Sequence, residues 1–370
     1  MTKVPGMLLG EIAQAMSALG DRTDLRSLVL PYPSAVQRAL DRIVLHCIER
    51  GLEPPKSLPE LMEWCRIRPI GDTVFGDPPP SPLHEATLVH PQGLLPTRTC
   101  LELASVGTDG GPEKEAHELL AQLAARCGSE ERFHRSRRFL ALNPVVRRGE
   151  RFDRRFGRGA WSKEIWAQVK SLYGPLPNFL TTEGTLLRCT ACRLPALLSG
   201  RRVPDRRNAV SGPETWCEGE ACPHGTELDL IRPAEGSLVL AKPLRIFLSL
   251  PFRLEQEVLG ELNRAVVACQ ALPGELGMYR LRGTGLAVHQ LHVHDRAQPA
   301  LLAHRLASAA RPVAVVVPEE RFRSTRYRTA FLQAASDPDQ ILLTGPTGLV
   351  SRLRGHGVGG GYETRGEADA

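Results

Sequence analysis

The sequence predicts an α+β protein built from several domains. Its 370 residues exceed the size at which one hydrophobic core keeps growing. Its character also changes twice along its length, from helical apolar spacing to a cysteine-rich centre and then to alternating strand and helix patterns. We predict a helical N-terminal domain at 1–128, an arginine-rich helical segment at 129–180, a cysteine module at 181–232, an α/β domain at 233–354 and a disordered tail at 355–370.

The N-terminal 128 residues carry the spacing and the end signals of helices. Apolar residues recur every three or four positions between Ser34 and Gly51. Ser34 is predicted to be the N-cap of this helix, and Gly51 lies just past its end. Ser57 and Glu60 have the spacing of a capping box. A further amphipathic helix is predicted over 113–127, where apolar residues recur at helical spacing. The glycine at 128 marks its end.

Composition favours a cytoplasmic protein. No stretch approaches the roughly 18 apolar residues that a membrane span requires, and the N-terminus has no cleavage signature. Nine cysteines is an odd number, and five of them are scattered through apolar patterns. Such usage is typical of buried thiols in a reducing compartment. The scattered cysteines are Cys47, Cys65, Cys100, Cys127 and Cys269.

Arginine dominates the positive charge and is concentrated in one segment. The net charge is +6, and 41 of the 47 basic residues are arginines. Ten arginines and only two acidic residues lie between Arg132 and Arg158. This segment would attract phosphate backbones of any sequence, although a GC-rich gene or a solvated helix face would give the same pattern. The predicted phosphate contacts are Arg135, Arg137, Arg138, Arg147, Arg148, Arg154 and Arg155.

The same segment interleaves aromatic residues with its arginines. Aromatic rings at these spacings either stack on bases or pack into a core, and the sequence leaves both readings open. The aromatic residues are Phe133, Phe139, Phe152, Phe156 and Trp161.

Four cysteines in two short pairs predict a zinc ribbon. Cys189 and Cys192 are separated by two residues, and Cys217 and Cys222 by four. Two such knuckles joined by a loop are the arrangement that tetrahedral four-thiolate zinc sites use, and a closed site of this kind is structural. Two reduced or redox-active pairs are the alternative. His224 would be a bystander.

Beyond residue 235 the sequence alternates between strand-like and helix-like patterns, as α/β domains do. The predicted strands are 238–250, 276–282, 286–294, 312–317 and 340–344, and the predicted helices are 254–269, 299–309 and 324–334.

With the zinc ribbon and the segment RRFLALNPVV at 137–146, this order of elements resembles a known family. The chain is similar to the restriction-endonuclease-like protein that accompanies prokaryotic Piwi proteins of the RE type. That family belongs to a three-gene bacterial antiphage defence module with a DinG-like helicase. The resemblance implies a restriction-endonuclease-like C-terminal domain and nucleic acid, DNA or an RNA:DNA hybrid, as a partner. It also implies association with a Piwi-type protein and a helicase.

Restriction-endonuclease-like folds place an acidic residue on one strand and a D/E-x-K pair on the next, where they bind Mg²⁺. The resemblance puts His292 and His294 at the positions of the D/E-x-K pair, and Tyr279-Arg280 where an aspartate is expected. Neutral imidazoles are poor magnesium ligands, so the centre is expected to be degenerate. Asp295 and Glu257 are the remaining acidic candidates.

Three functions follow from these features. The first hypothesis is a nucleic-acid-associated subunit of a Piwi-linked defence system that binds without cutting. The second is an active nuclease that uses Mg²⁺ with rearranged ligands among His292, His294, Asp295 and Glu257. The third is a zinc-ribbon scaffold whose basic segment meets an acidic protein. An alternative for His292 and His294, with Asp295 and His289 nearby, is a site for a transition metal.

Overall fold

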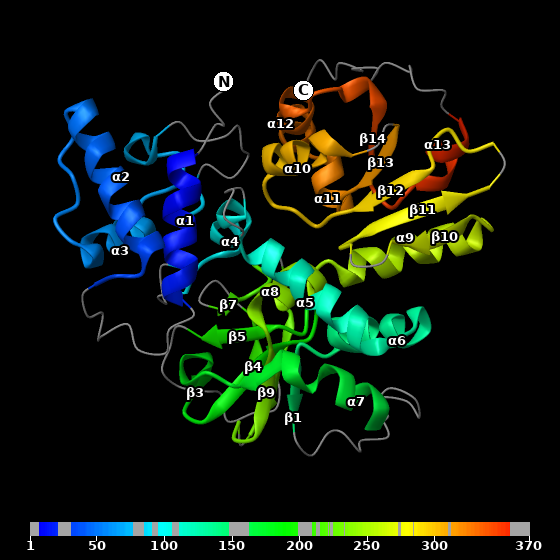
Figure 1. Ribbon diagram of the computed structural model, residues 1–370, viewed down its shortest axis with the longest axis horizontal. Coiled ribbons are helices and arrows are strands. Elements are labelled where there is room, and N and C mark those ends of the chain that lie inside the picture. Colours follow the sequence, from blue (N-terminus) through cyan, green and yellow to red (C-terminus); the bar gives the residue numbers. More distant parts are fainter. Residues whose placement is uncertain are drawn as a thin grey trace.

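The computed structural model combines a helical N-terminal part with three sheets in the remainder of the chain (Figure 1). The predicted α+β class with a helical N-terminal part is therefore confirmed. The described residues are 7–20, 31–76, 85–90, 95–105, 111–147, 163–198, 209–211, 215–220, 222, 225–232, 234–272, 275–283, 285–309 and 312–355. The predicted tail beyond Gly355 lies outside them.

Within its described residues, the N-terminal part contains four helices and one short 3-10 turn. α1 is buried along most of its length against α2 and α4, in a core of small and medium apolar side chains. The capping box is confirmed in one half: Ser57 Oγ accepts the Glu60 N–H. In the other half Glu60 Oε2 accepts the N–H of Lys56, the residue before the N-cap, instead of that of Ser57. The elements are α1 Met7–Gly20, α2 Ser34–Arg50, α3 Leu58–Ile67, the turn Thr73–Phe75 and α4 Arg98–Ala104.

A second layer of helices packs on a small antiparallel sheet of order β1-β9-β2. The described part of the segment at 129–180 is therefore not wholly helical. Val145 and Val146, which are β-branched and buried, pair with β9 instead of continuing α6. The elements are α5 Pro112–Cys127, α6 Glu130–Leu142, β1 Val145–Arg147, α7 Lys163–Val169, the turn Lys170–Leu172, β2 Tyr173–Pro175 and β9 Ser237–Leu240.

The cysteine module is a sheet of short strands. Its strand order is β6-β8-β4-β5-β7, and β3 pairs with β4. The elements are the turn Asn178–Leu180, β3 Thr181–Thr182, β4 Thr185–Cys189, β5 Pro195–Leu198, β6 Ala209–Val210, β7 Thr215–Cys217 and β8 Glu227–Ile231.

The strand predicted over 238–250 is wrong after Leu240. There the chain enters the helical turn α8 Lys242–Leu244 and the π-helical turn Arg245–Ser249. Pro243 cannot donate to a strand ladder but suits the first turn of a helix. All residues of the π-helical turn are buried. An element buried on every side leaves no periodicity to separate helix from strand.

The C-terminal sheet has five strands in sequence order, from β10 to β14. The pairs β10–β11 and β11–β12 are antiparallel, and the pairs β12–β13 and β13–β14 are parallel. α9 and α13 pack on one face, and α10 and α12 pack on the other. The elements are α9 Phe252–Arg264, β10 Ala268–Ala271, β11 Met278–Arg282, β12 Gln290–Val293, α10 Pro299–Arg305, the turn Leu306–Ser308, β13 Val313–Val316, α11 Glu319–Arg323, α12 Thr325–Ala334, the turn Pro338–Gln340, β14 Ile341–Thr344 and α13 Leu349–Gly355.

The predicted helix at 254–269 is too long, because α9 ends at Arg264 and Cys269 lies in β10. Val266 has a φ of 58°, a left-handed conformation that stops the helix. Ala265 and Cys269 have the spacing of the buried face of α9, which is why the sequence predicted a longer helix, but they lie beyond its end. None of the helices in the described part is both long and apolar enough to span a lipid bilayer.

Candidate functional site

The four cysteines predicted to bind metal lie together at one end of the cysteine module. Cys189 ends β4, Cys192 follows in the turn, and Cys217 ends β7. All four sulfur atoms, including that of Cys222, lie within 4.8 Å of one another. The Cys192 and Cys217 sulfurs are 3.2 Å apart, and the Cys217 and Cys222 sulfurs are 3.8 Å apart. Four thiols this close can hold one metal ion.

The second knuckle is anchored to the helical layer by a buried ion pair. Glu218, the residue after Cys217, receives two hydrogen bonds of 2.7 and 2.6 Å from the Arg245 guanidinium. Arg245 also donates to the backbone oxygen of Leu240. Gly219 approaches closely as well, because a Cβ there would lie 3.2 Å from the Cys192 sulfur. The cysteine cluster is thus fixed to the chain that leads into the C-terminal sheet.

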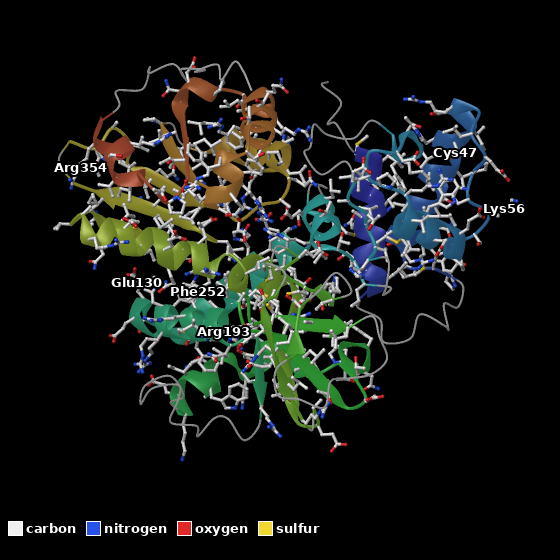
Figure 2. All side chains as sticks on the ribbon, turned by 180° about the vertical axis from the view of Figure 1, so that it is seen from behind. Cys47, Lys56, Glu130, Arg193, Phe252 and Arg354 are labelled. Atoms are coloured by element: carbon white, nitrogen blue, oxygen red, sulfur yellow. The ribbon has the colours of Figure 1, made fainter. Side chains whose placement is uncertain are left out.

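A second polar centre is buried beneath α9. Glu255 is 1% exposed, and both its carboxylate oxygens lie 2.9 Å from Arg137 Nη2. Tyr279 on β11 donates its hydroxyl to Glu255 Oε2 at 2.8 Å. Burial and the adjacent carboxylate raise the pKa of Tyr279, so its proton stays in place. This pair also joins α6 to α9, which lie side by side in Figure 1 and Figure 2.

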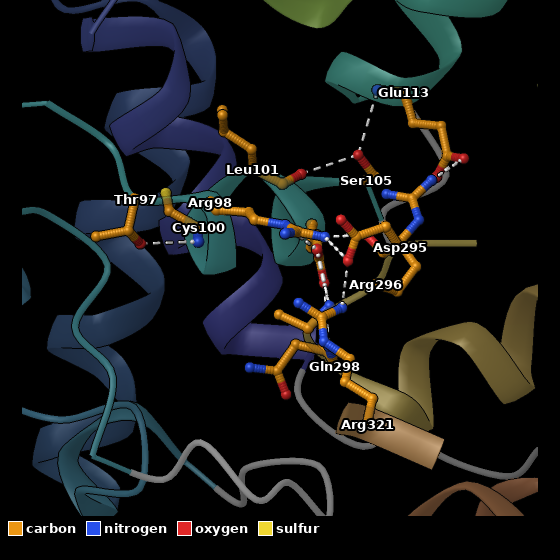
Figure 3. Close-up of polar contacts among 12 residues, drawn as sticks. Thr97, Arg98, Cys100, Leu101, Ser105, Glu113, Asp295, Arg296, Gln298 and Arg321 are labelled. Carbon is orange, nitrogen blue, oxygen red and sulfur yellow. Dashed lines mark hydrogen bonds and ion pairs between the residues drawn. The ribbon is translucent and has the colours of Figure 1, made fainter. Parts of the chain in front are cut away.

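The loop after β12 forms the neighbouring centre, in which Asp295 is held between two arginines (Figure 3). Asp295 Oδ1 lies 3.0 Å from Arg98 Nη2 and 2.9 Å from Arg321 Nη1. Arg98, on α4, also pairs with Glu102 at 3.0 Å. Burial alone would lower the pKa of Arg98, but the carboxylates of Asp295 and Glu102 raise it. Both ion pairs use Asp295 Oδ1, and the side chain is only 15% exposed.

Glu102 fixes the same loop from the N-terminal part. Its carboxylate accepts the backbone N–H of Ala297 at 3.0 and 2.9 Å and that of Gln298 at 3.0 Å. Gln298 is the N-cap residue of α10, and its own side chain makes no capping bond. Glu113 on α5 pairs with Arg296. Helices that precede residue 128 therefore hold the entrance of α10 in place.

The two centres face one small cavity. It is lined by Arg98, Glu102, Glu255, Gly277, His294 and Asp295, among others. Its volume of about 10 Å³ has room for about one water molecule. Gly277 has a φ of 67°, and a Cβ there would lie 2.2 Å from the Val293 oxygen, so only glycine fits.

The predicted catalytic residues are brought together only in part. His294 and Asp295 line the cavity, but Glu257 is exposed on α9. His292 and His294 are 3% and 4% exposed, and their ring centroids lie 5.8 Å apart. The pKa of His294 lies well below its usual value, mainly because the ring is buried and to a smaller extent because Arg296 is positively charged. His294 is therefore a neutral imidazole near pH 7.

The predicted phosphate contacts divide into three groups. Arg135 and Arg138 are exposed on α6, and Arg147 donates to the backbone oxygen of Arg232 at 2.8 Å. Arg137 is 9% exposed and bonds to Glu255, so its guanidinium points into the protein. The others, Arg148, Arg154 and Arg155, lie outside the described residues. Phe133 and Phe139 are buried and cannot stack on bases.

Sequence reasoning missed Glu255, Arg98 and Glu102. Glu255 lies three residues before Val258 and seven before Leu262, and therefore on the buried face of α9. That spacing was enough to prefer it to Glu257. No local signal marked Arg98 or Glu102, because their partners lie about 195 residues further along the chain.

Comparison with known protein families gives a match in the N-terminal part. A family model described as pPIWI_RE three-gene island domain Y matches residues 8–147. Comparison with curated proteins and with solved structures gave no match. The matched range contains α4, which carries Arg98 and Glu102, and α6, which carries the exposed arginines.

Proposed function

We propose that this chain, whose residues 8–147 form a pPIWI_RE three-gene island domain Y, is a cytoplasmic nucleic-acid-associated subunit of a Piwi-linked bacterial defence system. It binds nucleic acid without cutting it. One observation carries this proposal: the carboxylates near the centre that a nuclease would use are occupied by arginines. Asp295 pairs with Arg98 and Arg321, and Glu255 pairs with Arg137.

The element order supports a restriction-endonuclease-like C-terminal domain. A leading helix, α9, is followed by three antiparallel strands, a helix and a parallel strand. His294, at the lysine position of the family's motif, comes directly after β12. A fold of this order with its acidic positions replaced is what the family resemblance implies for a degenerate member.

The chemistry of the cavity argues against magnesium binding. Mg²⁺ requires octahedral oxygen ligands and keeps several of its waters, whereas this cavity has room for about one water molecule. The guanidinium groups of Arg98 and Arg137 already neutralise the carboxylates. A neutral imidazole at His294 offers nitrogen, a ligand to which Mg²⁺ binds poorly. Hydrolysis by a metal-bound water is therefore not expected.

Phosphate contacts are assigned to the outer face of α6. Arg135 and Arg138 are one helical turn apart and exposed, and their side chains make no hydrogen bond or ion pair within the described part of the chain. Arg147, Arg148, Arg154 and Arg155 follow directly in the sequence. Phe133 and Phe139 are buried, so α6 itself offers contacts to phosphates and not to bases. The other aromatic residues of the segment, Phe152, Phe156 and Trp161, lie outside the described residues. Arg137 serves the protein core instead.

The cysteine cluster is assigned a structural zinc ion. Four thiolates satisfy the tetrahedral geometry of Zn²⁺ and leave no open position for water. The ion would join the β4 turn to the β7 knuckle, and Glu218 and Arg245 would transmit that order to the helical layer. A Piwi-type protein and a DinG-like helicase are the protein partners that the family implies.

A gel-shift titration at several salt concentrations tests the proposed binding. For duplex DNA the slope of log K against log salt is about −0.9 for each phosphate contacted. Replacing Arg135 and Arg138 by Gln should make the slope less steep by about 1.8. The control changes Lys56 and Arg326 to Gln, both exposed and far along the chain from α6. Equal slopes in all three proteins would refute the assignment to α6.

A further inference from the structure

One face of the C-terminal sheet is only half covered by helices. The core beneath α10 and α12 takes strand residues from β13 and β14 and none from β10 or β11. On the opposite face Tyr279 and Leu281 pack towards α9. Because side chains alternate along a strand, Arg280 and Arg282 of β11 point to the uncovered face, and both are exposed.

The registers of the three strands place polar donors side by side on this face. Arg280 pairs with Gln270 on β10 and with Gln290 on β12. Arg282 Nη2 donates to Gln270 Oε1 at 3.2 Å. Arg280 makes no ion pair or hydrogen bond within the described residues, and Gln290 Oε1 is buried there without a partner. We call Gln270, Arg280, Gln290 and Arg282 the strand shelf.

The shelf carries positive charge, and the three strands that form it contribute no acidic residue. The sequence from Leu276 to His294 contains no Asp or Glu, and neither does β10. A row of one guanidinium between two amides presents several N–H donors to one side of the sheet. Such donors suit the oxygens of an anion, and arginine is the side chain best matched to phosphate.

We propose that the strand shelf binds the sugar-phosphate backbone of nucleic acid, as a contact surface additional to α6. This proposal rests on the proposed function and extends it. Arg280 and Arg282 are about 6.8 Å apart along the strand, which lets each meet a different phosphate. The four shelf residues include no aromatic ring to stack on a base, so binding here is independent of sequence.

The shelf and α6 lie on opposite sides of the sheet. Arg137 and Glu255 hold α6 against α9, and α9 covers the face that Tyr279 and Leu281 share. Arg280 and Arg282 point the other way, as the strand alternation requires. The two surfaces therefore contact different stretches of nucleic acid, and their contributions to binding should add without interaction.

The salt dependence of duplex DNA binding tests the shelf. Replacing Arg280 and Arg282 by Gln should make the slope of log K against log salt less steep by about 1.8. When salt rises from 50 to 200 mM, the factor by which affinity falls should then be about 12 times smaller for the variant than for the wild type. The exposed control pair Lys56 and Arg326, changed to Gln, should keep the wild-type slope, and all melting temperatures should agree.

The outcomes separate this proposal from the proposed function. One outcome is that the salt dependence of binding becomes less steep in the variant of Arg135 and Arg138 but stays as in the wild type in the variant of Arg280 and Arg282. In that case the shelf proposal fails and the α6 assignment stands. If the wild type does not bind duplex DNA or an RNA:DNA hybrid, both fail. If polyglutamate displaces the DNA as well as unlabelled duplex does at equal charge, the shelf is not a site for phosphate backbone.

Discussion

Replacing Glu255 by Gln should destabilise the protein far more than the same change at Glu257. Glu255 is 1% exposed and accepts hydrogen bonds from Arg137 at 2.9 Å and from Tyr279 at 2.8 Å. The neutral amide keeps the shape but leaves the Arg137 guanidinium buried without a counter-charge. Removing one partner of a buried ion pair costs about 3–5 kcal/mol.

Thermal unfolding gives the magnitude directly. For a unit of 150–250 residues, each kcal/mol lowers the melting temperature by about 2–4 °C, so Glu255→Gln should lower it by about 6–20 °C. Glu257 lies two residues away on the same helix but is exposed. Exposed changes usually fall within about 0.5 kcal/mol, so Glu257→Gln should change the melting temperature by about 2 °C or less.

Replacing the whole buried centre by apolar side chains shows whether Glu255→Gln destabilises the protein through an unpaired charge or through poorer packing. Changing Arg137 and Glu255 to Met and Tyr279 to Phe removes every polar group of the centre together, because their bonds join only these three side chains. Such replacements are often neutral, so this variant should recover most of the lost melting temperature. If Glu255→Gln and Glu257→Gln melt within 2 °C of each other, the buried centre described here is wrong.

Three further changes test the surrounding structure. Glu102→Ala removes the acceptor of the Ala297 and Gln298 N–H groups, and each N–H group left without an acceptor costs about 1–3 kcal/mol. Hydrogen exchange over 295–305 should therefore accelerate at least about 10-fold. The control Glu118→Ala, at an exposed position, should leave the exchange rate unchanged. The pKa of His294 is lower in the folded than in the unfolded protein, so the unfolded state binds the extra proton and stability should fall as pH drops below 6.5; His294→Gln should flatten that slope. Chelation should release one Zn²⁺ per chain and unfold β4, β5, β7 and β8, since structural zinc contributes about 10–16 kcal/mol at pH 7. Release of no zinc from purified protein would count against the metal assignment.

Local patterns in the sequence were sufficient to predict the helices and strands that have one buried face. The capping box at Ser57 and the helix ending at Gly51 both depend on neighbours within four residues. The cysteine cluster was likewise predictable, because two short knuckles need only a loop to meet. Periodicity failed where an element is buried on every side, as at 245–249.

The ionic centre could not be predicted from spacing. Arg98 and Asp295 are 197 residues apart, and Arg137 and Glu255 are 118 apart. An arginine that holds a buried carboxylate looks in sequence like one that contacts phosphate, which is why Arg137 was grouped with Arg135 and Arg138. Only the packing of α6 against α9 separates its role from theirs.

The central claim is that the chain binds nucleic acid but does not cut it, because the carboxylates at the centre that a nuclease would use are paired with arginines. Labelled single-stranded DNA, duplex DNA and an RNA:DNA hybrid, each incubated with the protein and with Mg²⁺, Mn²⁺ or EDTA, test it most directly. We predict retarded but intact substrate in every metal condition, because Arg98, Arg137 and Arg321 neutralise the carboxylates. Cleavage that requires metal and is abolished by Asp295→Ala would contradict the account.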